Sequence, residues 1–389
     1  FQARDGIRDY AVPGVQTCAL PIFFTFDSDM EWDSGTPWYR PTRIYHCTGG
    51  SGFGWRTGTG KFPVWYPDVL PPVLDVGPGC PTGVMSGQGA SFPADYQHAI
   101  YAFDCTYGTI YAIHLVPEGS SYTAVKEEFI TGVPLNVTDG VIGKDGNMYF
   151  AVGGRGTASA LYRVSYKGKA STERRFADNK LNRSLRMQRK QMETFHGKKV
   201  PGAVDKIWPR LGHRDRFIRF AARVALEHQP VDAWASRALE EKDLQTALSA
   251  LLALARQGAS GQQDALLIAM QQFSSADMSE AQQLEALRIL ALSFIRMGKP
   301  DDTATEDLIE ALGPLYPAKT DALNRELVAM LVYLGDPTVA AKTVPLLNQE
   351  ASGLEEMVFD DTLLKRSGQY GNSFLKQKAN NPQIGRAHV

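Results

Sequence analysis

Residues 145–164 read DGNMYFAVGGRGTASALYRV, two apolar runs separated by a glycine-rich stretch. Asp145 and Gly146 both tolerate positive φ angles, so they predict a tight hairpin turn before a strand over 147–152. The glycines that follow this strand predict a second turn, and a further strand is expected over 161–164. The stretch therefore predicts antiparallel β-structure.

The same pattern occurs once earlier in the chain. Tyr101 is followed by a glycine-containing loop and by IYAI at 110–113, much as Tyr149 is followed by GGRG and by LYRV at 161–164. The offset is 48 residues at the first tyrosine and 51 at the second. Blades of β-propellers repeat at about 40–50 residues. The repeat favours a propeller, with an antiparallel sandwich as the competing all-β interpretation.

Residues 23–166 form the segment with this β pattern. Its 144 residues hold about three blades, fewer than the roughly four to eight blades of a closed ring. We therefore expect a partial propeller, the ring being cut at its N-terminal side.

From about residue 174 the pattern becomes helical, with apolar residues three and four positions apart. Asp215 and Asp243 head comparable predicted helices 28 residues apart. The predicted helix ends contain glycine and fall at Gly258, Gly298, Gly313 and Gly335. Over 201–383 this predicts an α-solenoid of HEAT-like helical pairs, each burying its apolar stripe against its neighbours. The expected fold class is therefore a multidomain β plus α chain.

A basic connector, residues 167–200, separates the two parts. The stretch from Lys167 to Lys199 holds eleven Lys and Arg residues against three acidic ones. We favour a solvated connector helix, and the alternative is a docking face for an acidic partner. The formal net charge of the whole chain is −1, which indicates no bulk attraction to nucleic acid or to a membrane surface.

The two ends of the chain share an unusual relationship. Residues 16–22 (QTCALPI) and 384–389 (IGRAHV) resemble translations of one sequencing adapter in opposite orientations, and the alternative is natural termini that match it by chance. Such segments are excluded from reasoning about the fold. We expect 1–22 and 384–389 to be adapter-derived and 23–383 to be a fragment of a longer, metagenomic protein. The three cysteines within 23–383 form no CxxC or CxxCH motif, the signatures of zinc knuckles and c-type haem attachment.

Residues 24–56 read FTFDSDMEWDSGTPWYRPTRIYHCTGGSGFGWR. This stretch resembles the membrane-bound dehydrogenase family that has a sorbosone/glucose dehydrogenase-like β-propeller followed by HEAT-type repeats. Residues 58–72 (GTGKFPVWYPDVLPP) and 145–164 fit the same family. Residues 208–230 (WPRLGHRDRFIRFAARVALEHQP) resemble its helical region, and the resemblance covers nearly all of 23–347.

The resemblance implies a sugar or alcohol dehydrogenase that uses pyrroloquinoline quinone and calcium. It further implies export to the periplasm or cell envelope and electron transfer to a c-type haem domain absent from this stretch. The catalytic histidine of such propellers comes from an earlier blade, so no catalytic residue is assigned here. The alternative is a non-catalytic propeller and HEAT protein that recognises a glycan or a protein. We expect no nucleic-acid partner, and membrane association only through parts outside this stretch.

Four carboxylates alternate with other residues near the start of the β part: Asp27, Asp29, Glu31 and Asp33. On a strand they would share one face. A row of like charges is unfavourable unless it is solvated or bound to cations. Calcium takes six to eight oxygen ligands, and the resemblance adds that quinone dehydrogenases of this kind use calcium. The two interpretations are a calcium site and a solvent-facing segment.

Four residues are candidates for binding the quinone. Arg40 and Arg43 lie in PWYRPTR, and arginine binds carboxylates such as those of the quinone in a bidentate manner. Their alternative role is a structural ion pair with the acidic run just upstream. Arg155, in GGRG, resembles by position the late-blade arginine that contacts the quinone in related dehydrogenases. Asp104, in the equivalent loop of the earlier hairpin, is a weaker candidate of the same kind.

Overall fold

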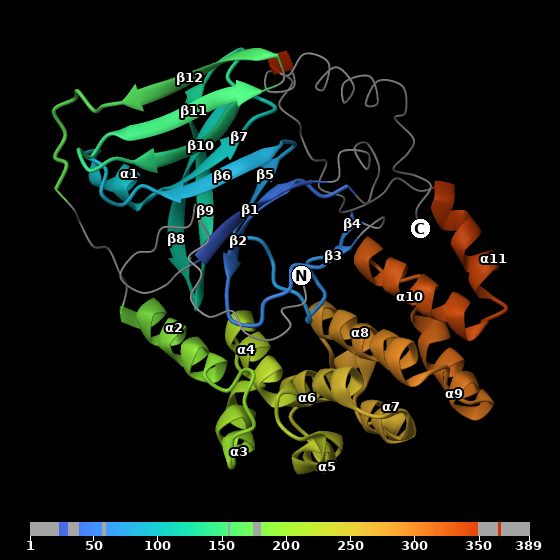
Figure 1. The fold of residues 1–389 in the computed structure, drawn as a ribbon. Coiled ribbons are helices and arrows are strands. Elements are labelled where there is room, and N and C mark those ends of the chain that lie inside the picture. The colour runs from blue at the N-terminus through green and yellow to red at the C-terminus, as the bar shows by residue number, and fades with distance from the viewer. Residues whose placement is uncertain are drawn as a thin grey trace.

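The computed structural model describes residues 23–29, 39–56, 60–154, 156–173, 180–348 and 365–366. The two expected adapter-derived ends lie outside these residues. Antiparallel sheets occupy the described chain up to residue 164, and helices occupy most of it from residue 180 onward (Figure 1). The predicted β plus α organisation is confirmed.

The described strands are, in chain order, β1 (Phe23–Asp27), β2 (Thr42–Cys47), β3 (Trp55–Arg56), β4 (Gly60–Lys61), β5 (Leu74–Gly77), β6 (Pro81–Ser86), β7 (Ile100–Asp104), β8 (Thr109–Glu118), β9 (Ser121–Thr131), β10 (Val137–Ile142), β11 (Met148–Gly154) and β12 (Thr157–Val164). They form three larger antiparallel sheets with the orders β1-β2-β5, β6-β7-β8-β9 and β10-β11-β12, and a ribbon of β3 and β4. A short helix, α1 (Ala94–His98), lies between β6 and β7. The first strands of the three sheets are neighbours, since β6 contacts both β1 and β10.

The hairpin that the sequence predicts at Asp145-Gly146 is present and joins β10 to β11. Gly146 has a φ of 76°, and the amide of Gly143 donates to the carbonyl of Asn147 at 2.8 Å. The two halves of the sequence repeat are equivalent in structure. β7 and β8 are the second and third strands of one sheet, and β11 and β12 are those of the next.

Strand β7 is buried along its whole length because other sheets cover both of its faces. Tyr101 and Phe103 pack with residues of β10 and β11 such as Met148. Ile100 and Ala102 point the other way and pack with residues of β1 and β2. A strand buried on both faces needs a continuous apolar run rather than an alternating one. This explains why IYAF lacks the alternation of polar and apolar residues.

The described helices from residue 180 onward are α2 (Lys180–Glu193), α3 (Ala203–Ile207), α4 (Arg216–Glu227), α5 (Ala235–Glu240), α6 (Leu244–Gln257), α7 (Gln263–Gln271), α8 (Glu280–Met297), α9 (Asp302–Leu312), α10 (Asp321–Leu334) and α11 (Val339–Thr343). Successive contacts join α2, α4, α6, α8 and α10 into one layer, which faces the sheets (Figure 1). A second layer contains α3, α5, α7 and α9 on the side away from the sheets. None of the described helices is long and apolar enough to cross a membrane.

The helix boundaries follow from local chemistry. Asp215 caps α4, because its side chain accepts from the amide of Ile218 at 3.1 Å. Asp243 caps α6 in the same way, accepting from Thr246 at 2.9 Å, and such caps satisfy amides that the helix itself leaves unpaired. The predicted glycines are the C-caps of α6, α8, α9 and α10. The predicted helix starts and ends are therefore confirmed.

Candidate functional site

The two parts of the chain meet at a segment of irregular backbone, residues 62–70, which we call the docking segment. Asp68 lies at its centre and accepts two hydrogen bonds from Arg288 of α8, Nε to Oδ1 at 3.0 Å and Nη2 to Oδ2 at 2.9 Å. Arg256 of α6 adds a contact to Oδ2 at 3.2 Å. Asp68 is only 8% exposed and Arg288 only 6%. We call the contact between the docking segment and the inner helix layer the joint.

Burial and neighbouring charges shift the pKa of the Asp68 carboxyl in opposite directions. Burial alone would raise its pKa, because the charged form loses its water. The hydrogen bonds and the charge of Arg288, with the charges of Arg223 and Arg256, outweigh burial and hold the pKa of Asp68 below its usual value. Asp68 is therefore charged in the folded protein at neutral pH.

Aromatic residues of the docking segment contact a second carboxylate. Trp65 Nε1 donates to Glu326 Oε1 of α10 at 3.0 Å, and the Tyr66 hydroxyl donates to Oε2 at 3.1 Å. Burial raises the pKa of Glu326, although these hydrogen bonds work in the opposite direction. The Tyr66 ring also lies 4.1 Å from the guanidinium of Arg288, within the range of a cation–π contact.

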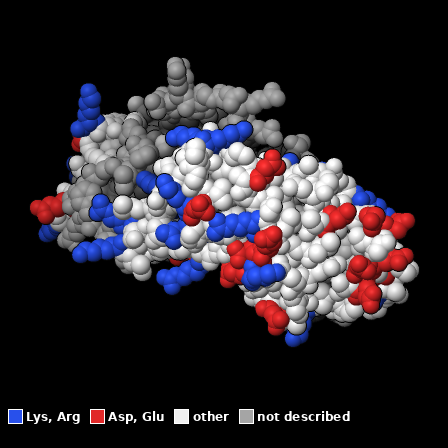
Figure 2. All heavy atoms as spheres, turned by 90° about the horizontal axis from the view of Figure 1, so that it is seen from below, with Lys and Arg blue, Asp and Glu red and all other residues white. Residues whose placement is uncertain are grey.

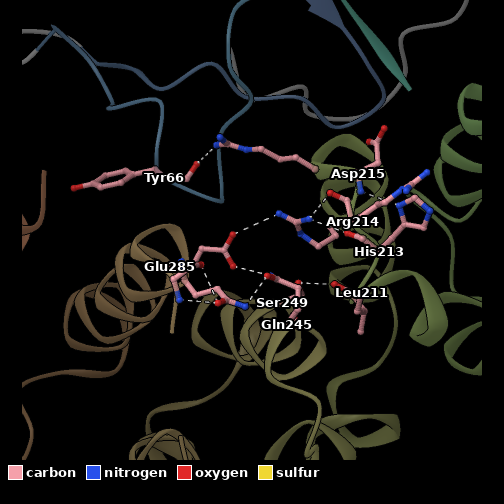
Figure 3. A network of polar contacts seen from close by, with 12 residues as sticks. Tyr66, Leu211, His213, Arg214, Asp215, Gln245, Ser249 and Glu285 are labelled. Atoms are coloured by element: carbon pink, nitrogen blue, oxygen red, sulfur yellow. Dashed lines mark hydrogen bonds and ion pairs between the residues drawn. The ribbon is translucent and has the colours of Figure 1, made fainter. Parts of the chain in front are cut away.

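The backbone of the docking segment is held by α4. Arg216 Nη2 donates to the carbonyl of Tyr66 at 2.7 Å and to that of Val69 at 3.0 Å. Figure 3 shows this part of the joint, with the carbonyl end of Tyr66 turned toward the polar network and its ring pointing away from it. Burial lowers the pKa of Arg216 to about 10, which leaves it charged at neutral pH. Leu70 completes the contact by packing on Phe220 and Val224.

A second contact lies at the turn between β8 and β9. Asp215 Oδ2 accepts from the amide of Ser120 at 2.6 Å, and Oδ1 accepts from its hydroxyl at 2.7 Å. Arg189 of α2 donates to the Ser120 carbonyl at 3.1 Å. Gly119 has a φ of 53°, and a Cβ at this position would collide with Asp215 Oδ2. Asp215, the N-cap of α4, thus also anchors the β8–β9 hairpin.

A buried histidine lies near this second contact, on β2. His46 Nδ1 is 2.9 Å from the Ser121 hydroxyl, and the ring stacks on Phe24 at 5.2 Å. Burial, with the nearby charges of Arg189, Arg186 and Lys190, lowers the pKa of His46 to about 3. His46 is therefore neutral at physiological pH and serves as a packed core residue.

Of the predicted quinone-binding arginines, Arg43 is buried in β2 and Arg40 precedes the strand. Arg43 Nε donates to Asp75 Oδ1 of β5 at 2.6 Å. Arg43 thus forms its ion pair within the sheet, with Asp75 rather than with the acidic run upstream. Arg40 Nη1 donates to the Tyr39 carbonyl at 2.8 Å. Burial and the charge of Arg43 lower the pKa of Arg40 to about 10.

Asp104 is fully buried and organises the turn after β7. Its Oδ1 accepts from the amides of Thr106 at 2.8 Å, Tyr107 at 3.2 Å and Cys80 at 3.3 Å. A carboxylate that accepts several backbone amides is a stable local motif. These contacts give Asp104 a structural role in the turn.

The acidic run is only partly described. β1 ends at Asp27, so the strand expected to carry all four carboxylates stops before Asp29. Asp29 is buried and accepts from the Tyr39 hydroxyl at 2.5 Å. Glu31, Asp33 and the predicted quinone ligand Arg155 lie outside the described residues. Within the described part of the chain, no three His, Cys, Asp or Glu side chains are grouped so as to hold a metal ion.

The basic connector is a helix over part of its length, α2. Two of its cations contact the sheets, since Arg189 donates to the Ser120 carbonyl and Arg186 lies 5.3 Å over the Tyr122 ring. Figure 2 shows Lys and Arg gathered toward one end of the face seen from below and Asp and Glu toward the other. Part of the basic run therefore attaches α2 to the sheets.

The joint was not predicted from the sequence. Its docking segment lies within the FPVWYPDVLPP tract, where prolines and large aromatic residues are dense. That composition signals an irregular segment that buries its side chains. No pattern indicates that Asp68 pairs with Arg288, because the two are far apart in the chain.

The fold defines a protein of two parts, antiparallel sheets fixed onto a double layer of helices. No family model matches the chain, and no curated protein matches it. One similar solved structure is a protein from Thermus thermophilus, provisionally named an oxidoreductase (glucose dehydrogenase), with 14% identity and a TM-score of 0.31. The alignment covers 39% of this chain and 43% of that one, less than half of its length. The likeness is loose and does not establish a shared fold.

Proposed function

We propose that this chain is the supporting part of a sorbosone/glucose dehydrogenase-like protein. In this proposal the three larger sheets are successive propeller blades, and the helices are HEAT-type repeats that hold them. The adjacency of β1, β6 and β10 supports the blade assignment, because blades of a propeller meet along their first strands. The observation that carries the proposal is the docking segment, which lies within the family-like tract 58–72 and is bound by α4, α6, α8 and α10.

The proposed activity is the oxidation of a sugar or alcohol with pyrroloquinoline quinone and calcium, in the periplasm or cell envelope. The quinone would accept the electrons and pass them to a c-type haem domain. In this proposal two of the described candidates serve the fold, since Arg43 is engaged by Asp75 and Asp104 by three backbone amides. The remaining proposed ligands are Arg40 and Arg155 for the quinone and the acidic run for calcium. The role of the described residues is to fix the blades relative to the helices.

This proposal is tested with the longest product that the source DNA encodes. Quinone and calcium are added, and binding is followed by the quinone absorbance and activity by dye reduction with a panel of sugars and alcohols. Saturable quinone binding that Arg155→Ala weakens, with dye reduction, supports the proposal. If neither binding nor dye reduction occurs with any substrate, the dehydrogenase assignment is wrong.

A second candidate function is a non-catalytic scaffold that binds a glycan or a protein through the same architecture. The internal engagement of Arg43 and Asp104 favours it, because two described positions expected at the quinone are used for folding. Glycan-array binding in the absence of any quinone binding would support the scaffold. Quinone-dependent dye reduction would exclude it.

A further inference from the structure

A small cavity lies beside the joint, where α4, α6 and α8 meet the docking segment. Its volume is about 20 Å³, and a site of this size holds about one particle as large as a water molecule. Its polar and backbone lining comes from Pro67 of the docking segment, Arg216, Arg219 and Arg223 of α4, Ser249 of α6 and Glu285 of α8. The cavity therefore touches the docking segment and three of the helices that bind it, α4, α6 and α8.

The three arginines line one face of α4, because residues three and four positions apart are neighbours on a helix. Arg216 donates to the carbonyls of Tyr66 and Val69. Arg219 Nη1 donates to the carbonyls of His213 at 2.8 Å and Arg214 at 3.0 Å. Carbonyl groups satisfy these donors but do not neutralise their charge.

Arg223 is the most buried of the three, at 2% exposed. Its Nη1 donates to Glu227, whereas its buried Nε finds no hydrogen-bond acceptor among the described residues. A buried donor without an acceptor is strongly unfavourable, and more so on a charged group. The burial that surrounds this side chain also lowers its pKa. Arg223 is thus a lining residue of the cavity, and its Nε carries an N–H without an acceptor among the described residues.

Positive charge exceeds negative charge around the cavity and the joint. The described guanidinium groups there belong to Arg216, Arg219, Arg223, Arg256 and Arg288, and the described carboxylates to Asp68, Glu227, Glu285 and Glu326. Glu285, the carboxylate on the cavity itself, is already engaged. One of its oxygens lies 3.7 Å from Arg219, and the other accepts from Gln245 at 2.8 Å (Figure 3). Among the described residues of this region, five arginines thus accompany four carboxylates.

We propose that a small monovalent anion of the size of chloride binds in this cavity. It would accept the N–H of Arg223 Nε and balance the excess charge of the α4 arginines. Because the same cavity touches α6, α8 and Pro67, a bound anion would hold the helices in the arrangement that receives the docking segment. This site is independent of the proposed dehydrogenase activity and lies apart from the candidate cofactor residues.

The first test measures thermal unfolding of the full chain in sodium chloride and in sodium gluconate at equal ionic strength. Gluconate is too large for the cavity, so it controls for general screening. At about 100 mM salt we expect chloride to raise the melting temperature by about 2–4 °C over gluconate, because an anion bound only by the folded state stabilises it. Equal melting temperatures in the two salts would overturn the proposal.

Two variants test whether the rise in melting temperature comes from chloride bound in this cavity. Arg223→Gln removes the donor and should abolish the chloride increment, whereas Arg214→Gln makes the same charge change at an exposed position and should keep it. A chloride increment that persists in folded Arg223→Gln would place the ion elsewhere. If Arg223→Gln does not fold, crystals of the unaltered protein grown in bromide test the proposal instead. An anomalous peak within hydrogen-bond distance of Arg223 Nε is expected, and its absence from the cavity would show that water alone fills it.

Discussion

Asp68 and Arg288, 220 residues apart in the chain, form a buried bidentate pair with Nε–Oδ1 and Nη2–Oδ2 distances of 3.0 and 2.9 Å. The pair joins an irregular segment of the β part to the middle of an inner helix. Charged hydrogen bonds of this geometry are short and directional. The relative position of the sheets and helices therefore depends on a few polar contacts as well as on apolar packing.

Removing Arg288 should destabilise the whole chain. Arg288→Met leaves the Asp68 carboxylate buried with only the contact from Arg256, and loss of one partner of a buried pair costs about 3–5 kcal/mol. Urea unfolding followed by near-ultraviolet circular dichroism measures the loss. The control is Asp205→Asn in the exposed Arg237–Asp205 pair, where the Asp205 side chain is 83% exposed and the loss should stay below about 1 kcal/mol. Equal losses in the two variants would show that the pair does not support the joint.

Gly119→Ala should disrupt the contact between the β8–β9 turn and α4. Gly119 has a φ of 53° and no room for a Cβ beside Asp215, whereas Gly197 has a φ of 70° with open space around it. Both substitutions place a Cβ at a positive φ angle, which costs about 1–2 kcal/mol. Gly197→Ala is therefore the matched control. We expect Gly119→Ala to lose at least about 1 kcal/mol more in urea unfolding, because the Ser120–Asp215 hydrogen bonds must also lengthen. Similar losses would mean that the turn relaxes without straining the contact.

The stability of the protein should fall as the pH drops below about 6.5, in part through His46. The folded state lowers the pKa of His46 from 6.5 to about 3, so the neutral ring is favoured by the fold and protonation favours unfolding. The contribution of His46 to the free energy of unfolding is fully present above the unfolded-state pKa of 6.5. It is lost as the pH falls from there toward the folded-state pKa of about 3.

The measurement is the free energy of unfolding of the unaltered protein and of His46→Gln at pH 7 and pH 5. The unaltered protein should lose about 2 kcal/mol more than the variant over this interval, since one proton changes stability by up to about 1.4 kcal/mol per pH unit. His98→Gln, at an exposed histidine, should keep the pH dependence of the unaltered protein. A His46→Gln variant with that same dependence would show that His46 is not the titrating group.

Asp104→Ala distinguishes a structural residue from a cofactor ligand. If Asp104 organises the turn, the variant should lose at least about 2 kcal/mol with no quinone present, because three backbone amides lose a charged acceptor. Asp145→Ala is the control, since Asp145 accepts one backbone amide in an exposed turn and its loss should be clearly smaller. Thermal and urea unfolding of the cofactor-free protein measure both. An unchanged stability of Asp104→Ala would return Asp104 to the candidate quinone ligands.

The sequence predicted those features that depend on neighbouring residues. The Asp145-Gly146 turn, the strands predicted over 147–152 and 161–164 and the helix caps at Asp215 and Asp243 are all present, with strand ends shifted by a few residues. Each follows from steric or hydrogen-bonding preferences within a few residues. The partners of the candidate site residues were not predicted. Arg43 pairs with Asp75 on another strand rather than with the acidic run, and β1 ends before Asp29.

The sequence by itself determined where this chain forms strands and where it forms helices. It did so because hydrophobic periodicity, turn residues and caps act locally. Only the tertiary structure decided how the two parts are joined. Trp65, Tyr66 and Asp68 have partners on helices more than 180 positions away, and no local pattern encodes such a partner. The same holds for the α4 arginines, whose shared face is visible in the sequence but whose cavity exists only after α6, α8 and the docking segment have packed around them.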